Sequence, residues 1–256
     1  MSSPSLHAGV LDALGLAITS GDVPAGTPLT LDGIGAEHGV SRTVAREVMR
    51  MLEGLGMVRS RRRVGLVVLG MEDWNVLDPR VIRWRLQGPG RDAQLRSLTE
   101  LRHAVEPLAA AGAARHATPQ VRGELVDLAR RMRTLGEAGD LTEFLALDVR
   151  MHELLLRSSG NEMFGPLADV VAEVLAGRTH LGLMPPSPAP EALDQHEAVA
   201  RAVAEHDPDA AEAAMARIVG EVRRALDDLP DRTPDRMPDR MPDRMPDDED
   251  GASRRG

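Results

Sequence analysis

Apolar residues recur at helical spacing through almost the whole stretch from residue 93 to residue 229, and this periodicity is the strongest constraint on the fold. The pattern breaks only at short segments rich in Gly, Pro and Ser, and we find no credible strand between them. The aromatic residues are Trp74, Trp84, Phe144 and Phe164, and tyrosine is absent. A core of Leu, Val, Ala and Met suits helices better than sheets. We therefore expect a mainly α fold with an all-helical bundle of six or seven helices over 93–229.

Four polar side chains lie on the apolar faces of these predicted helices. Asp148 and His152 are four residues apart, so they share one helix face with apolar neighbours. His196 and Arg178 occupy similar positions on two further helices. Burying such groups without partners would cost several kcal/mol. The set therefore predicts either core residues that hydrogen-bond to one another or a site for a divalent metal ion with an anion beside it.

The first 70 residues carry a different pattern. Helices are predicted over 6–20, about 30–38 and 42–54, with the tight turn GVS before the third. The segments MVRS and GLVVL then predict a two-stranded hairpin, with three arginines between them. Helix, helix, turn, helix and hairpin is the order of a winged helix-turn-helix DNA-binding domain.

The third of these helices has one cationic face and one apolar face. The chain carries a net charge of −9, but seven arginines and only two acids lie between positions 41 and 63. Arginines at every fourth position of this helix form one stripe, which suits a helix that enters the major groove. The hairpin arginines would reach phosphates or the minor groove, with a glycine allowing close approach. The alternative is a solvated helix surface. The residues expected to contact DNA are Arg42, Thr43, Arg46, Arg50, Arg61, Arg62, Arg63 and Gly65.

These patterns divide the chain into four parts. We expect a DNA-binding domain at 1–70, a connector with one docked turn at 71–92, the helical domain at 93–229, and a disordered tail of Pro-Asp-Arg repeats at 230–256. The absence of cysteine excludes disulfides and thiolate metal sites. We find no signal peptide and no membrane span, and expect a soluble cytoplasmic protein without a membrane partner.

Two parts of the chain resemble a known family. The stretch from GDVPAGTPL through GVSRTVAREVMRMLEGLGMV to VGLVV resembles the DNA-binding domain of the GntR family of bacterial transcription regulators. The segments ELRHAVEPLAAAGAA, LDVRMHELLLRSSGN and DQHEAVARAVAEHDPDAAEAAM resemble the FCD effector-binding domain of its FadR subfamily. WNVLDPRVIRW is similar to the connector of sugar-acid (galactonate-type) operon repressors. The resemblance covers residues 6–229 and implies a homodimer that binds a pseudo-palindromic operator in double-stranded DNA.

The resemblance also implies a metal site. In this family an aspartate, a histidine four residues later and two further histidines often bind a divalent metal, and the matching positions here are Asp148, His152, His196 and Ile218. Isoleucine cannot coordinate a metal and should pack in the core instead. Three ligands would still suit Zn²⁺, Ni²⁺ or Mn²⁺ and leave positions open to water or an effector. A second departure stands at Leu31-Asp32, where the family often has an acid followed by an arginine.

The effector residues follow from the same resemblance. An arginine at the position of Arg102 meets the effector's carboxylate in the family, while the alternative for this residue is an internal ion pair with Glu106. Arg178 and His180 are further candidates for the effector pocket. We expect a repressor that a small carboxylate or sugar acid releases from DNA, and not an enzyme. The alternatives are a metal-dependent hydrolase or lyase acting on a small hydroxy acid, and a sensor of lactate, another small monocarboxylate or a fatty-acyl ligand.

Overall fold

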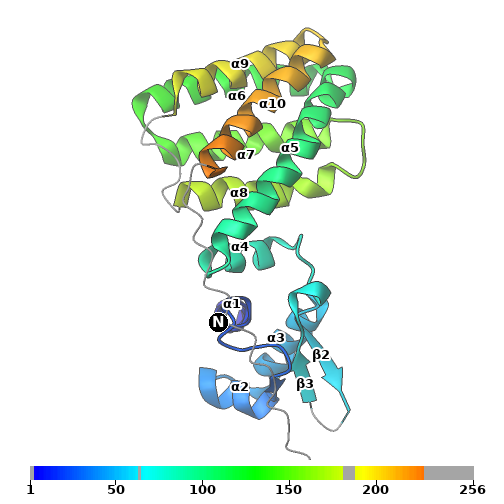
Figure 1. Cartoon of the computed structure of the whole chain (residues 1–256), viewed down its shortest axis with the longest axis vertical. Helices are drawn as coiled ribbons and strands as arrows, with labels where there is room; N and C mark the ends of the chain where they lie inside the picture. Colours follow the sequence, from blue (N-terminus) through cyan, green and yellow to red (C-terminus); the bar gives the residue numbers. More distant parts are fainter. Residues whose placement is uncertain (1–2, 63–64, 181–187, 228–256) are drawn as a thin grey trace, which may run out of the picture.

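The computed structural model describes residues 3–62, 65–180 and 188–227, and the chain is mainly α-helical, as expected. Arg63 of the expected hairpin tip and the repeat tail at 230–256 lie outside these ranges. A small N-terminal domain with the sheet lies at one end of the molecule and a larger bundle of helices at the other (Figure 1). Helix α4 (Pro79–Gln87) lies between the two.

The N-terminal domain combines three helices with a small antiparallel sheet. The helices are α1 (Ser3–Ser20), α2 (Leu31–His38) and α3 (Arg42–Gly54). The strands are β1 (Pro28–Leu29), β2 (Val58–Arg61) and β3 (Gly65–Val68), in the order β1-β3-β2. The winged helix-turn-helix order is confirmed. Strand β1 was not predicted, because two residues are too few to show alternation.

The turn between α2 and α3 sets the direction of α3. Gly39 ends α2 in the left-handed region at φ 64°, which glycine adopts without strain. The side chain of Ser41 then accepts a hydrogen bond from the backbone N–H of Val44, and this N-cap starts α3. Val48 and Leu52 of α3 are buried in the core of the domain, so the opposite face of the helix lies open to solvent.

The connector contains more structure than the single docked turn expected from the sequence. A 3-10 turn (Met71–Asp73) precedes α4, which is nine residues long. Asp78 caps α4 by accepting a hydrogen bond from the backbone N–H of Arg80, and Pro79 occupies its first turn. Both are helix-start signals that the sequence displays.

Helix α4 packs into both domains. Val81 and Trp84 belong to the core of the N-terminal domain, and the indole N–H of Trp84 donates to Asp12 on α1 over 2.9 Å. Ile82 and Leu86 belong to a second apolar cluster with residues of α5 (Arg91–His116) and α8 (Ala168–His180). A change at α8 can therefore reach the DNA-binding domain through direct contacts.

The helical domain contains α5, α6 (Pro119–Ala138), α7 (Leu141–Arg157), α8, α9 (Pro190–Ala204) and α10 (Pro208–Asp227), with a 3-10 turn at Gly165–Leu167 before α8. This agrees with the expected six or seven helices. Helix α5 crosses the domain and contacts α7, α8, α9 and α10 (Figure 1). None of the described helices combines the length and hydropathy that a membrane span requires.

Candidate functional site

Helices of the C-terminal domain bring polar side chains from distant parts of the sequence into one interior group. Its members are Arg102 and Glu106 on α5, Asp148 and His152 on α7, Arg178 on α8 and His196 on α9. Arg178 is half-buried, and the other five are at most 6% exposed. The side chains predicted on apolar helix faces thus do point inward.

Asp148, His152 and His196 lie close enough to share one ion. One oxygen of Asp148, Oδ1, lies 3.2 Å from Nε2 of His196 and 3.4 Å from Nε2 of His152. The three potential ligand atoms all lie within 4.8 Å of one another. Among the described residues, these three form a group that could hold a metal ion.

The hydrogen bond that one ring nitrogen of His196 makes outside this group shows whether the other nitrogen carries a hydrogen or a lone pair. Its Nδ1 lies 2.6 Å from the carbonyl oxygen of Ala192, which can only accept, so Nδ1 carries the hydrogen. Nε2 of the neutral ring is then an acceptor, and it faces the Asp148 carboxylate. Two acceptors that face each other in a buried site require a cation between them, either a proton or a metal ion.

His152 has a similar environment. Its Nδ1 lies 2.7 Å from Oε2 of Glu106, and its Nε2 faces the Asp148 carboxylate. Despite these short distances, neither ring nitrogen makes a well-directed hydrogen bond. The Glu106 carboxylate therefore lies against Nδ1, while Nε2 has no aligned hydrogen-bond partner and remains available to a metal.

Electrostatics keep both carboxylates of the group ionised. Burial alone would raise the pKa of Glu106, but Arg102 and His152 outweigh it and lower the pKa to about 2. Burial would likewise raise the pKa of Asp148, and the two histidines lower it instead. For His152, burial opposes the charged ring, but Glu106 and Asp148 raise its pKa to about 9. The two carboxylates therefore favour the protonated form of the His152 ring in the metal-free fold.

Arg102 makes the internal ion pair that the sequence left open as an alternative. Its Nε donates to Oε1 of Glu106 over 2.6 Å, and Nη2 lies 3.3 Å from Oε2. Nη1 is buried and has no partner among the described residues. The same holds for Oγ1 of Thr99, three residues earlier on α5. Unpaired buried donors cost roughly 1–3 kcal/mol each, so both atoms are candidates to bond to a polar ligand.

Thr99 was not predicted as a site residue. Its three-residue spacing from Arg102 puts both on one face of α5. That spacing is the only signal the sequence offers for it.

Arg178 faces the same group from α8. Burial, reinforced by the positive charge of Arg102, lowers the pKa of its guanidinium to about 10, and Asp148 acts in the opposite direction. No described side chain pairs with it. His180 is the last residue of α8, and its side chain lies outside the described part of the structure.

Ile218 packs where the resemblance would place a fourth metal ligand. It is 7% exposed and belongs to the main apolar core, with Ala214 and Met215 of the same helix. The expectation that it packs in the core is confirmed.

The structure leaves the cationic face of α3 open. Arg42, Thr43, Arg46 and Arg50 are all exposed. Arg42 lies 3.6 Å from Asp32 in a solvent-exposed ion pair, which contributes little to stability. Asp32 stands where the family often has an arginine. The position therefore carries an acid that lies beside Arg42 of the predicted DNA-binding face.

The hairpin places further arginines at the far end of the N-terminal domain. Arg61 ends β2, and Arg61 and Arg62 are exposed. Gly65 has φ 105°, and a Cβ there would lie 3.0 Å from the carbonyl oxygen of Leu29. The fold of the hairpin therefore favours glycine at this position whether or not DNA approaches it.

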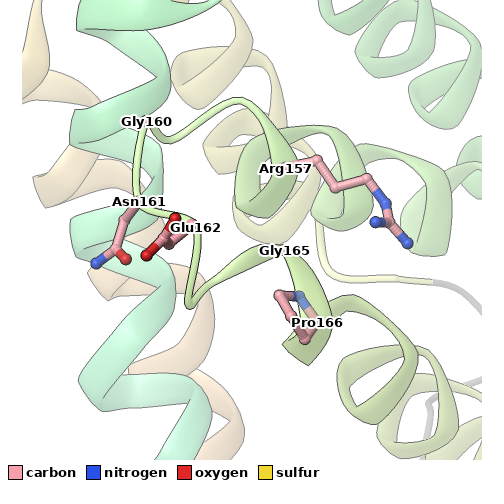
Figure 2. Close-up of a pocket in the computed structure, with 6 residues that line it drawn as sticks. All are labelled: Arg157, Gly160, Asn161, Glu162, Gly165 and Pro166. Atoms are coloured by element: carbon pink, nitrogen blue, oxygen red, sulfur yellow. The ribbon is translucent and has the colours of Figure 1, made fainter.

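A surface hollow of about 460 Å³ lies beside the segment that joins α7 to α8 (Figure 2). Arg157, Glu162 and Pro166 are among its lining residues. Arg157 is already paired with Glu153 over 2.9 Å. None of the predicted site residues lines this hollow.

A winged helix-turn-helix domain joined to a separate helical domain defines a DNA-binding protein with two domains. Comparison with known families identifies this class more closely. Residues 6–68 match the family described as "Bacterial regulatory proteins, gntR family", and residues 97–221 match the family described as "FCD domain". The chain belongs to the GntR family of transcription regulators and carries an FCD domain.

Individual relatives agree with this assignment. The chain is 29% identical over 220 residues to the galactonate operon transcriptional repressor of Escherichia coli K12, covering 84% of this chain and 94% of the relative. It is 28% identical over 201 residues to the HTH-type transcriptional regulator YieP of the same organism, covering 78% and 86%. These relatives are regulators and not enzymes, which argues against the hydrolase or lyase alternative.

A solved structure shows the same fold. It belongs to Lar of Listeria monocytogenes, described as controlling the expression of the agr system. The TM-score is 0.53 at 17% identity, with 90% of this chain and 100% of the other covered.

Proposed function

We propose that this regulator represses a sugar-acid operon, and that a small carboxylate effector bound beside a metal ion controls its affinity for the operator. The observation that carries the proposal is the convergence of two buried histidine Nε2 atoms on one oxygen of Asp148. The similarity to a galactonate operon repressor supports the class of effector.

Asp148, His152 and His196 would hold the metal. One oxygen and two nitrogen donors suit Zn²⁺, Ni²⁺ or Mn²⁺. The ion would supply positive charge and open coordination positions for a carboxylate and a neighbouring hydroxyl. The chain's own residues orient the ligands, since the Ala192 carbonyl holds the ring of His196 and Glu106 lies against that of His152.

The effector would meet donors from two helices. On α5, Nη1 of Arg102 and Oγ1 of Thr99 are buried and have no hydrogen-bond partner among the described residues. Arg178 faces the same group from α8. Guanidinium and hydroxyl donors suit a polar acid. They do not suit a long acyl chain, whereas lactate or another small hydroxy acid would fit the same chemistry.

The contacts of α8 offer a route to the DNA-binding domain. Val170 and Val174 of α8 pack on α4, and Glu173 pairs with Arg83 of α4. A shift of α8 when an effector binds Arg178 would therefore move α4 and the winged domain attached to it. Release from DNA follows only if the effector binds the off-DNA arrangement more tightly.

On the operator, two copies of the chain would each place α3 in the major groove. Arg42, Thr43 and Arg46 lie in the N-terminal turns of α3, which contact base edges in this class of domain. Arg61 and Arg62 of the hairpin would contact phosphates beside the groove. A symmetric dimer requires a pseudo-palindromic site.

Thermal-shift screening tests this proposal. Galactonate, gluconate and lactate would be added to protein loaded with Zn²⁺ and to protein treated with a chelator. We expect at least one acid to raise the melting temperature of the metal-loaded protein only, and Arg102→Ala to lose that rise. If no aldonate or hydroxy acid stabilises the metal-loaded protein, the proposed effector class is wrong.

A further inference from the structure

Glu106 contacts both halves of the proposed site at once. Its Oε1 accepts from Nε of Arg102 over 2.6 Å, and its Oε2 lies 2.7 Å from Nδ1 of His152. The side chain is 1% exposed, so no water competes for these oxygens from bulk solvent. One carboxylate thus joins an arginine on α5 to a histidine on α7.

The position of Glu106 explains how it reaches both partners. It lies four residues after Arg102 on α5, so the two side chains share one helix face. That face packs against α7, which carries His152. A carboxylate presents an acceptor oxygen to each partner, whereas a neutral amide of the same shape would turn its NH₂ group towards one of them.

We propose that Glu106 is a positioning residue that couples metal binding to effector binding. It orients His152 so that Nε2 faces the metal position, and it holds Arg102 so that Nη1 remains free for an anion. The inference rests on the proposed function, since it assigns Glu106 a role toward the metal and the effector of that site. It predicts that the two ligands influence each other through this side chain.

The first test measures the affinity of the purified protein for Zn²⁺ alone, by competition with a chelating indicator. Removing a carboxylate that orients a metal-binding histidine typically costs about 10–100-fold in metal affinity. We expect a loss of that size in Glu106→Gln. Glu100→Gln is the matched control, because Glu100 is exposed on the same helix, and it should bind Zn²⁺ like the wild type.

A double-mutant cycle tests the coupling to Arg102. The cycle compares the effect of Arg102→Met on Zn²⁺ affinity in the wild type and in Glu106→Gln. Direct repulsion between the Arg102 guanidinium and Zn²⁺ is lost in both comparisons, so it cancels. If Glu106 carries the coupling, Arg102→Met should change Zn²⁺ affinity by a different factor in the wild type than in Glu106→Gln. If the loss of Zn²⁺ affinity in the double variant equals the product of the two single losses to within about twofold, the coupling is overturned.

A third measurement needs no substitution at Glu106. Long-range ¹H–¹⁵N correlation spectra of the Zn²⁺-loaded wild type report which nitrogen of His152 carries the proton. We expect a protonated Nδ1 and a metal-bound Nε2, and the opposite assignment would overturn the inference even if Glu106→Gln does not fold.

The outcomes separate the two proposals. Wild-type protein that binds no Zn²⁺, Ni²⁺ or Mn²⁺ contradicts the metal site itself, and with it the proposed function. Wild-type protein that binds Zn²⁺ while Glu106→Gln binds it equally well contradicts only the role given to Glu106.

Discussion

The contact between α1 and α4 can be tested with two glycines of the same helix. A Cβ added at Gly15 would lie 2.5 Å from ring atoms of Trp84, which itself is 2% exposed. A Cβ added at Gly9 would meet nothing within 4 Å. Gly15→Ala and Gly9→Ala therefore gain the same helix propensity, and only the first forces the indole ring or the helix to move.

The magnitudes follow from this geometry. Replacing glycine by alanine inside a helix stabilises by about 0.8–1 kcal/mol, while overpacking a filled core costs typically about 1–3 kcal/mol. Gly9→Ala should be stabilised, and Gly15→Ala should fall below it by about 1–3 kcal/mol. For a domain of this size, each kcal/mol corresponds to roughly 4–8 °C in melting temperature.

Circular dichroism melts of the full chain provide the assay. The transition of the N-terminal domain should occur at least about 4 °C lower in Gly15→Ala than in Gly9→Ala. Equal melting temperatures would refute the packing of α1 on Trp84, and with it the direct joint between α4 and the winged domain.

Three further predictions concern charge. Because the pKa of His152 is raised from 6.5 to about 9 in the metal-free fold, its ring stabilises the fold fully below pH 6.5, and this roughly 3 kcal/mol is lost as pH rises towards 9. Urea unfolding of chelator-treated protein should show that decline, and His152→Gln should abolish it; a wild type equally stable at pH 6 and pH 9 would contradict the assignment. Arg46→Ala should weaken operator binding in fluorescence anisotropy by about 5–150-fold, since a base contact contributes about 1–3 kcal/mol, whereas Arg130→Ala, on the exposed surface of α6, should not. Arg62→Ala should weaken binding to any DNA and reduce the slope of log K against log salt by about one, and an unchanged slope would exclude a phosphate contact.

Local patterns were sufficient to predict most of the fold. Helical spacing and the signals at Ser41 and Gly39 predicted α3 and the turn before it, and the structure confirms both. The connector helix α4 was predicted as only one turn, although Asp78 and Pro79 form a clear start signal. The stability of α4 comes from Trp84 and Leu86, which are buried in two different domains, and a local pattern does not show such contacts.

The candidate site could be predicted only in part. Spacing along single helices identified Asp148 and His152 as one pair and placed His196 and Arg178 on inward faces. The contact between Glu106 and His152 joins two residues on different helices that are more than forty positions apart in sequence, so no local spacing indicates it. Whether a buried donor is left unpaired, as at Thr99, likewise depends on the atoms packed around it.

Operator affinity in the presence and absence of metal and effector tests the central claim most directly. Fluorescence anisotropy would follow the protein on its own promoter DNA while the stabilising acid from the thermal-shift screen is added. We predict that the metal-loaded protein loses about 5–150-fold in operator affinity, the usual range of allosteric coupling, and that chelator-treated protein and Asp148→Asn do not respond. An equal loss of affinity without metal, or no loss with it, would contradict the account.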